Sequence, residues 1–291
     1  MSLTQAQIDN FRTVGFLNVG RVYTDEEADA LRDRLMTVMA GTSRGKAEAV
    51  RNIAGEELEA ERDVVIQVVN TWQADDGFRV HLYHPEICRM ACELIGTDVL
   101  RVWHDQIQYK PPRRGGATDW HQDHPYWPII QPADLVSAWV ALDDATVENG
   151  CMRMVPRSHH WGPHKGGTIG TNEDGFTPDP DRSLIPDGEE VEIVPCEVKK
   201  GECMFHHCLT WHGSPPNPTD NGRPAIAVHY MPGWTRYEPS RSHIMERRVD
   251  VEPGDLLTGH YFPTVWDHGP VEPQAQWSEE ASSGGQRRET G

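Results

Sequence analysis

Three residues that lie far apart in the chain have the types and the spacing of a metal-binding set. His121 and Asp123 form a His-x-Asp pair, and His212 follows much later in the segment Trp-His-Gly-Ser. Two histidines and one carboxylate form the facial triad that leaves positions open on a non-haem Fe(II) for an oxidant and a co-substrate. Arg223 lies beyond His212 and offers a docking point for a carboxylate. Together these residues suggest oxygen chemistry with 2-oxoglutarate.

The His-x-Asp pair alone is a weak signal, because two polar residues at this spacing are common in solvated turns. In an extended chain, residues two apart point to the same side, so both side chains could reach one metal. The later segment contains three histidines, His206, His207 and His212, and any of them could be the third ligand. Only His212 is followed directly by a small-residue turn, with Arg223 eleven positions on (223 − 212 = 11).

Arg223 has two alternative interpretations. It stands just before the apolar run Ala225–Tyr230, at the root of a strand that we expect to be buried. An unpaired buried charge is costly, so this arginine needs an anionic partner. The partner is either an aspartate or glutamate of the chain, in a salt bridge, or the carboxylate of a co-substrate held by a bidentate clamp.

The order of the motifs resembles the phytanoyl-CoA dioxygenase-like family of Fe(II)/2-oxoglutarate-dependent oxygenases, from roughly Phe11 to Pro232. The motifs that carry the resemblance are Phe11–Phe16, Lys110-Pro-Pro, Trp120–Trp127, Trp139–Asp144, Glu148–Met152, Val155–His159, and Leu209–Ser214 with Asn217 and Arg223. The combination in this order is far more specific than any one piece. Family members usually read Pro-Gly-Ser-His where this chain has Pro156-Arg-Ser-His159, a departure outside the metal-ligand motif.

The resemblance implies a ligand set and a co-substrate. Iron would be bound by His121, Asp123 and His212, and 2-oxoglutarate would chelate the iron through its 2-oxo acid end. The distal carboxylate of 2-oxoglutarate would meet Arg223 and the hydroxyl of Ser214. In related halogenases a small residue replaces the carboxylate ligand, so the retained Asp123 favours hydroxylation over halogenation.

Further residues are expected near the co-substrate. Trp139 resembles the family tryptophan that flanks 2-oxoglutarate, although a core position in a strand is the commoner fate of tryptophan. Gln106 and Gln108 lie on the polar face of the strand before the triad, which lines the pocket in this family, and we assign them to 2-oxoglutarate or substrate. Tyr126 and Trp127 either form a substrate wall or seal the mouth of the barrel.

The implied function is an Fe(II)- and 2-oxoglutarate-dependent dioxygenase. It would use O2 to hydroxylate an unactivated C–H bond of a small metabolite or natural-product intermediate, releasing succinate and CO2, with desaturation or cyclisation as other oxidative outcomes. A rival class is a cupin-like metal-dependent isomerase or hydrolase, which would not use 2-oxoglutarate and would not need Arg223. A third class is a non-catalytic binding protein with a degenerate barrel.

The elements that must position these residues follow from local patterns. Capped helices are predicted over residues 4–12 and 24–39, and a further helix over 84–95. Strands are predicted at 15–19, 63–70 and 99–110, and then at 136–143, 151–155, 190–194, 202–205 and 225–231. Helices followed by many short strands predict an α+β, mainly β chain. The resemblance specifies a double-stranded β-helix (jelly-roll, cupin-like), with the N-terminal helices packed on one sheet.

The organisation expected from this pattern is one oxygenase domain over residues 1–270 and a mobile tail over 271–291. The segment 161–187 is long and polar for a loop, which is typical of a lid or binding segment.

Charge and composition restrict the partners. Lys plus Arg is 27 and Asp plus Glu is 45, a balance of 27 − 45 = −18, which argues against nucleic acid or an anionic membrane surface. The six cysteines form no Cys-x-x-Cys pair, and we find neither a signal peptide nor a spanning segment. We therefore expect a cytoplasmic protein, monomeric or homodimeric, that acts on a small molecule.

Overall fold

The structure is a computed structural model that describes residues 2–41, 49–52, 65–113, 115–164 and 185–273. The described part is mainly antiparallel β, and its α-helices all lie in the N-terminal third of the chain. These helices are α1 (Gln5–Val14), α2 (Asp25–Met39), α3 (Asp76–Leu82) and α4 (Pro85–Ile95). None of the described helices is long and apolar enough to cross a membrane.

The helix ends follow the sequence signals. Thr4 caps α1 and Thr24 caps α2, and each forms a capping box with the residue three positions on. Helix α4 has Pro85 in its first turn and ends at Gly96, whose φ of 82° is left-handed. The three predicted helices are therefore confirmed, whereas α3 was not anticipated.

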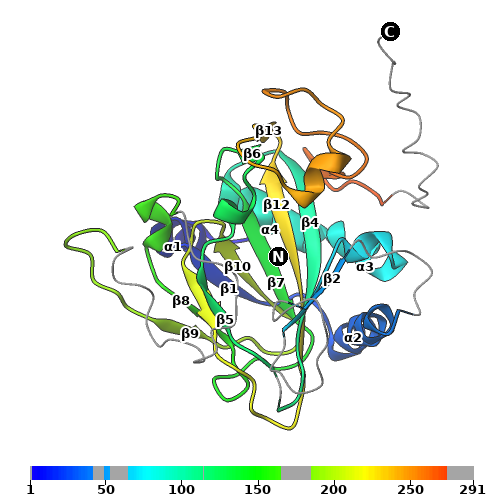
Figure 1. Cartoon of the computed structure of the whole chain (residues 1–291), viewed down its shortest axis with the longest axis vertical. Coiled ribbons are helices and arrows are strands. Elements are labelled where there is room, and N and C mark those ends of the chain that lie inside the picture. The colour runs from blue at the N-terminus through cyan, green and yellow to red at the C-terminus, as the bar shows by residue number, and fades with distance from the viewer. Residues whose placement is uncertain (1, 42–48, 53–64, 114, 165–184, 274–291) are drawn as a thin grey trace.

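The strands form two larger antiparallel sheets and a short ribbon. The large sheet has eight strands in the order β1-β10-β7-β12-β4-β3-β2, with β14 paired to β4, and the small sheet has the order β5-β11-β8-β9. Figure 1 shows β7, β12 and β4 side by side, with β5, β8 and β9 in a separate layer. The strand bounds are β1 (Phe16–Arg21), β2 (Ala49–Asn52), β3 (Ile66–Val69), β4 (Val99–Lys110), β5 (Thr118–His121), β6 (Ile130–Gln131), β7 (Val136–Ala141), β8 (Met152–Met154), β9 (Val194–Cys196), β10 (Glu202–His207), β11 (His212–Ser214), β12 (Arg223–Pro232), β13 (Arg236–Tyr237) and β14 (Thr264–Asp267).

One predicted strand is wrong. Residues 190–193 have no regular structure, and β9 starts only at Val194. Its partner β8 ends at Met154, which pairs with Val194, so the preceding residues have no neighbouring strand to pair with. The alternation of Glu and Val or Ile in this segment mimics an amphipathic strand without such a partner. Most of the expected loop 161–187 and of the expected tail lies outside the described residues.

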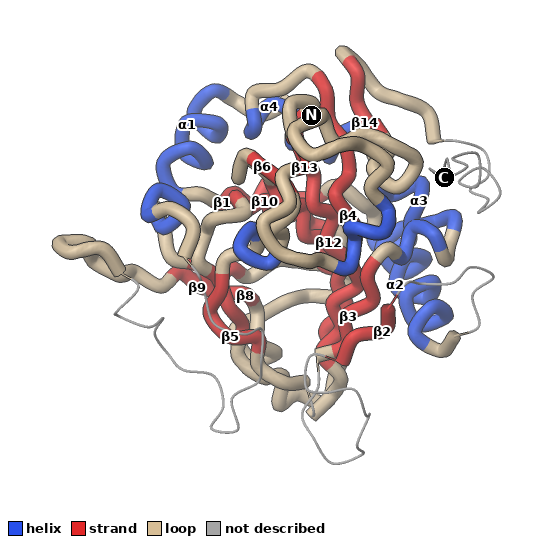
Figure 2. Tube along the Cα trace, turned by 45° about the horizontal axis from the view of Figure 1, so that its top comes forward, coloured by secondary structure: helices blue, strands red, loops and turns tan. Residues whose placement is uncertain are grey.

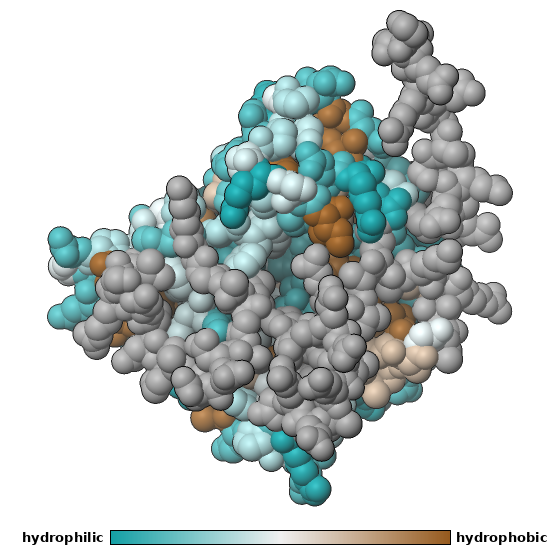
Figure 3. Space-filling model, in the orientation of Figure 1, coloured by the Kyte–Doolittle hydropathy of each residue, from teal (hydrophilic) through white to brown (hydrophobic). Residues whose placement is uncertain are grey.

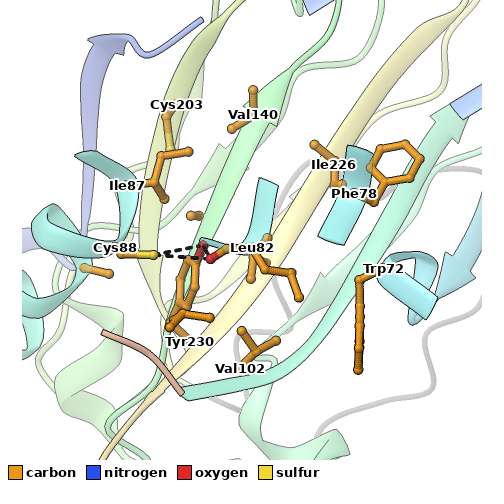
Figure 4. Close-up of a cluster of buried hydrophobic side chains, with 14 of the residues drawn as sticks. Trp72, Phe78, Leu82, Ile87, Cys88, Val102, Val140, Cys203, Ile226 and Tyr230 are labelled. Atoms are coloured by element: carbon orange, nitrogen blue, oxygen red, sulfur yellow. Dashed lines mark hydrogen bonds between the residues drawn. The ribbon is translucent and has the colours of Figure 1, made fainter. Parts of the chain in front are cut away.

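Strand β12 is buried along its whole length and separates two environments. Its residues Ile226, Val228 and Tyr230 belong to the core cluster beneath the helices, together with Phe78 and Ile87. Figure 4 shows this cluster, in which the Tyr230 hydroxyl donates to the carbonyl of Leu82 at 3.0 Å. Figure 2 shows α2 and α3 beside the β2–β3 edge of the same sheet. The helices thus cover one face of the large sheet.

The alternate residues of β12 face the small sheet. Ala225 and Ala227 pack with Trp139 of β7 and with Met152 and Met154 of β8, so this cluster joins the two sheets. Because successive side chains of a strand point to opposite faces, the apolar outer face and the site-facing inner face come from one alternating sequence. The small Ala225 and Ala227 side chains leave room on the inner face.

Removing side-chain volume from the outer face of β12 tests this arrangement. Ile226 is fully buried, so we expect Ile226→Ala to lower the free energy of unfolding by about 2–5 kcal/mol. The matched control Leu256→Ala removes a side chain that is 40% exposed, and we expect it to change the free energy of unfolding by less than about 0.5 kcal/mol. Chemical denaturation measures both, and equal effects would contradict the assignment of Ile226 to the core.

Candidate metal centre and its cavity

A cavity of about 310 Å³ lies between the large and small sheets, and Figure 3 shows this face hollowed near its centre, with hydrophilic side chains inside. All eight site residues predicted from the sequence line it. They are Gln106, Gln108, His121, Asp123, Trp139, His212, Ser214 and Arg223. The structure therefore brings together residues that are more than one hundred positions apart in the chain.

The triad is assembled by two paired strands and the turn that follows one of them. His121 ends β5, His212 begins β11, and the two residues are antiparallel partners. Asp123 follows His121 in the turn before a short 3-10 helix (His124–Tyr126), with φ −71° and ψ −49° rather than an extended backbone. The expectation that both residues sit on one extended segment is thus corrected, because the chain turns at Asp123.

The ligand atoms of the triad converge. Oδ1 of Asp123 lies 3.6 Å from Nε2 of His121 and 3.6 Å from Nε2 of His212. The three side chains are the group of metal-binding residues whose ligand atoms all lie within 4.8 Å of one another, and all three are buried. Such a spacing lets one ion touch two imidazole nitrogens and one carboxylate oxygen.

The backbone sets the tautomer of both histidines. Nδ1 of His121 lies 2.8 Å from the carbonyl oxygen of Asp119, and Nδ1 of His212 lies 2.9 Å from that of Thr210. A carbonyl oxygen only accepts, so each Nδ1 carries the proton and each Nε2 presents a lone pair. Two neutral imidazoles and a carboxylate without thiolate are a donor set that suits Fe(II). The residues present therefore fit such an ion.

The second oxygen of Asp123 is engaged by other side chains. Its Oδ2 accepts from the Ser137 hydroxyl at 3.0 Å and lies 3.1 Å from Nε2 of His206. Ser137 has one proton and gives it to Asp123, so Nδ1 of His229, at 2.7 Å from the Ser137 oxygen, is the donor of that pair. Because Ser137 and His206 engage Oδ2, the other oxygen, Oδ1, is the one directed at the two ligand histidines.

The electrostatics of Asp123 agree with an ionised carboxylate. Its burial opposes the charge, but His212, His121 and His206 outweigh this effect and hold the pKa of Asp123 well below its usual range. Burial also lowers the pKa of His229 to about 4, so that imidazole is neutral.

Gln122, between the two ligands in sequence, points away from them. Its Nε2 donates to the carbonyl oxygens of Leu209 at 2.7 Å and Gly162 at 3.0 Å, and its Oε1 accepts from the His164 amide at 2.9 Å. This side chain therefore ties the metal-binding turn to the segment that leads into β11.

The opposite end of the cavity holds Arg223. Its side chain is buried, 2% exposed, and among the described residues no carboxylate lies within ion-pair distance of it. One guanidinium nitrogen donates to the carbonyl of Gly150, while Nε has no hydrogen-bond partner. The guanidinium carbon lies 5.6 Å from the ring centre of Trp139, and burial lowers the pKa of Arg223 to about 10. Two partners were considered for Arg223, a carboxylate of the chain and the carboxylate of a co-substrate. The described residues supply no carboxylate for the first, so they contain no salt bridge to Arg223.

A second buried basic group stands beside Arg223. Lys110 is fully buried, is the cross-strand partner of Arg223, and donates to the carbonyls of Ser214, at 3.1 Å, and Pro215. Burial and the neighbouring Arg223 hold the pKa of Lys110 well below its usual range. Trp139 donates from its indole nitrogen to Oε1 of Gln108 at 2.9 Å, which fixes the amide next to this basic end.

Four of these residues were not assigned to the site in the sequence interpretation. Lys110 stood inside a recognised motif, and His206 was one of three candidate ligands. The structure places His206 against Asp123, whereas His207 lies outside the cavity lining and accepts from the Leu209 amide. Ser137 and His229 were not singled out. Strand alternation is the sequence signal that could have found these two residues, because Ser137 shares a strand face with Trp139 and His229 shares one with Arg223.

The fold and the site define a class before any relative is considered: proteins that hold a two-histidine, one-carboxylate site inside an antiparallel β fold. The sequence model described as Phytanoyl-CoA dioxygenase (PhyH) matches residues 11–225. The chain therefore belongs to the phytanoyl-CoA dioxygenase family.

Relatives and solved structures agree with this membership. Peroxisomal phytanoyl-CoA dioxygenase of Homo sapiens is 27% identical over 258 residues, covering 81% of this chain and 70% of the human protein. The non-heme alpha ketoglutarate dependent carbocyclase SnoK from nogalamycin biosynthesis is 29% identical with a TM-score of 0.74, covering 90% of this chain and 96% of SnoK. The epimerase SnoN, 23% identical with a TM-score of 0.68 over 89% of this chain and 97% of its own, shares the fold.

Loss of one triad imidazole should abolish metal binding. We expect His212→Ala to hold less than about a tenth of the Fe(II) bound by the parent protein, because two ligands remain where a stable site needs three. The matched control is His268→Ala, whose side chain is 72% exposed and remote from the cavity lining. Elemental analysis after anaerobic loading measures both, and full iron content in His212→Ala would exclude this residue as a ligand.

Ser137 provides a second test of the site. Removing its hydroxyl in Ser137→Ala leaves Oδ2 of Asp123 with one donor fewer, so the carboxylate is held less firmly. We expect the Kd for Fe(II) or Mn(II) to rise by roughly ten- to a hundredfold, as for other residues that orient metal ligands. Metal titration measures the Kd, and the unfolding midpoint of the variant is expected to stay unchanged. An unaltered affinity would show that His206 alone is enough to orient Asp123.

Proposed function

We propose that this chain is a non-haem Fe(II)- and 2-oxoglutarate-dependent oxygenase that uses O2 to oxidise a C–H bond of a small molecule. One observation carries the proposal: a single cavity holds a converging two-histidine, one-carboxylate set at one end and, at the other, the buried Arg223, which has no carboxylate partner among the described residues. Family membership and the likeness to SnoK, a non-heme alpha ketoglutarate dependent enzyme, support the same cofactor set.

His121, Asp123 and His212 would hold the iron through Nε2, Oδ1 and Nε2. When bound, Fe(II) with 2-oxoglutarate supplies the activation of O2 that oxidises a C–H bond, with release of succinate and CO2. The chain supplies the ligand geometry, because two backbone carbonyls fix the tautomers and Ser137 and His206 fix the carboxylate. These contacts use Nδ1 and Oδ2, so they can orient the ligands while Nε2 and Oδ1 stay available for the metal.

The basic end would bind the distal carboxylate of 2-oxoglutarate. Arg223 and Ser214 line the cavity together, and the unpartnered Nε of Arg223 supplies a free donor. Lys110, which lies outside the cavity lining, donates to the carbonyl of Ser214 and helps to hold that residue in place. A bound carboxylate would give Arg223 the anionic partner that the described residues do not supply, which makes the pairing favourable in a low-dielectric site. Trp139 and Gln108 would form the wall beside the co-substrate.

We propose hydroxylation as the outcome on the substrate. Ring closure is a second candidate, because SnoK is a carbocyclase and matches nearly the whole chain. For the architecture, we assign the two facing sheets to a double-stranded β-helix that forms one domain over residues 1–270.

Substitution of Arg223 tests the proposal against the rival isomerase or hydrolase, which would not need this residue. We expect Arg223→Gln to raise the KM for 2-oxoglutarate at least about thirtyfold, equivalent to roughly 2 kcal/mol, because a buried carboxylate would lose its charged partner. Succinate formation by the iron-loaded protein is the measurement.

The control for this experiment is Arg113→Gln, which removes an exposed side chain paired with Asp220 and should leave the KM unchanged. The proposal fails if the iron-loaded parent protein neither binds nor consumes 2-oxoglutarate, or if Arg223→Gln has the parent KM.

A further inference from the structure

The cavity extends well beyond the part that iron and 2-oxoglutarate would fill. Strands β4 and β12 form one wall, along which Arg223 pairs with Lys110 and, six residues further, His229 pairs with His104. Since His229 contacts Ser137, which donates to Asp123, this wall spans the part between the co-substrate end and the metal end. The remaining lining comes from β3, from the turn after β5 and from a short 3-10 helix (Ile244–Arg248).

The side chains of this remaining part are uncharged. They include three amides, two imidazoles and an aromatic wall: Gln67, Asn70, Gln106, His104, His243, Tyr126 and Trp127. Among the described residues that line the cavity, only Asp123 and Arg223 carry a formal charge. Metal binding would use the first and the distal carboxylate of 2-oxoglutarate the second, so no described lining residue is left to neutralise a charged substrate.

Burial makes this absence of charge important. A charged group taken out of water without a partner is strongly disfavoured, whereas hydroxyl and amide groups need only hydrogen bonds. A coenzyme A thioester, with its phosphate groups, is therefore poorly matched to this cavity.

The polar groups present can recognise a neutral molecule. Nδ1 of His104 lies 3.4 Å from the carbonyl oxygen of Asp105, which only accepts, so Nε2 of His104 is an acceptor. Gln106 and Gln67 are half-buried amides that both donate and accept. His104 also packs edge-on against Trp127, with ring centres 5.7 Å apart, so the acceptor stands beside a flat apolar surface.

We propose that the substrate is an uncharged molecule that presents a ring or other flat apolar group with hydroxyl or N–H donors, and not an acyl-coenzyme A. This inference rests on the proposed function, because it assigns Asp123 to the metal and Arg223 to the co-substrate. The volume of about 310 Å³ must hold the co-substrate as well, which restricts the substrate to a small molecule.

Three probes of one shape and different charge test the inference. They are 4-hydroxybenzyl alcohol, which is neutral, 4-hydroxybenzoate, an anion, and 4-hydroxybenzylamine, a cation. The protein is loaded with Zn(II), which does not react with O2, and with 2-oxoglutarate, and Kd values come from ligand-observed NMR. Loading is verified first, so a failure to bind metal or 2-oxoglutarate would count against the proposed function and not against the substrate class.

The neutral probe is expected to bind at least tenfold more tightly than either ion. Phytanoyl-CoA at 1 mM is expected not to displace it. Binding of either ion as tightly as the neutral probe, displacement by phytanoyl-CoA, or no binding of the neutral probe at 10 mM would each overturn the inference.

Substitutions that place a charge at Gln106 test whether the cavity lining selects the ligand by its charge. Gln106→Lys should shift the ratio of anion to neutral binding at least tenfold toward 4-hydroxybenzoate, and Gln106→Glu should shift the corresponding ratio toward 4-hydroxybenzylamine. Gln5→Lys, on the exposed side of α1, is the matched control and should leave all ratios unchanged. Unchanged ratios in both Gln106 variants would show that the neutral lining does not select the ligand.

Discussion

The burial of β12 on both faces is the constraint on which the remaining structure depends. All ten of its residues are buried, so each face needs its own cover. The helices of the N-terminal third cover the side that carries Ile226, Val228 and Tyr230, and the small sheet covers the side that carries Ala225 and Ala227. Arg223 and His229 occupy the ends of that second side. The cavity exists because the alternation places alanines between these two larger polar residues.

Asp123 is the residue on which the polar contacts of the site converge. Its two oxygens face different partners, Oδ1 toward the ligand histidines and Oδ2 toward Ser137 and His206. A buried carboxylate with so many donors is costly to desolvate, but the donors that compensate it also fix its orientation. The strands β7, β10 and β12 each contribute one residue to this arrangement, namely Ser137, His206 and His229. The large sheet thereby sets the geometry of a ligand that lies outside its own strands.

The sequence allowed α1, α2 and α4, the long strands and the metal-binding motif to be predicted, because these depend on local patterns, whereas α3 was not anticipated. The capping threonines, the β-branched run ending near Val69 and the His-x-Asp pair are signals within a few residues. The strands β5 and β11 are too short to show periodicity, although they bring His121 and His212 together. The predicted strand at 190–194 had the right alternation but no partner beyond Val194, and pairing is a property of the fold.

The contacts of Ser137 and His229 could not be predicted for a related reason. A serine or histidine in an apolar strand has no local feature that reveals whether it satisfies a core partner or orients a ligand. Only the register of β7 against β12, in which Ser137 and His229 are partners, decides the matter. Family resemblance supplied the motif residues, whereas these contacts follow from how β7 and β12 pair.

The paired buried bases, Lys110 and Arg223, have a consequence for how this protein balances folding against function. Among the described residues the hydrogen-bond acceptors of both groups are carbonyl oxygens, so the folded chain bears much of the cost of desolvating them. An anion that binds to Arg223 favours the native state by the free energy of its own binding. Conformational stability and co-substrate affinity are therefore thermodynamically linked, and replacing a buried base by an apolar residue of similar volume would strengthen the fold while weakening recognition. At Lys110 and Arg223, stability and activity are therefore in a trade-off.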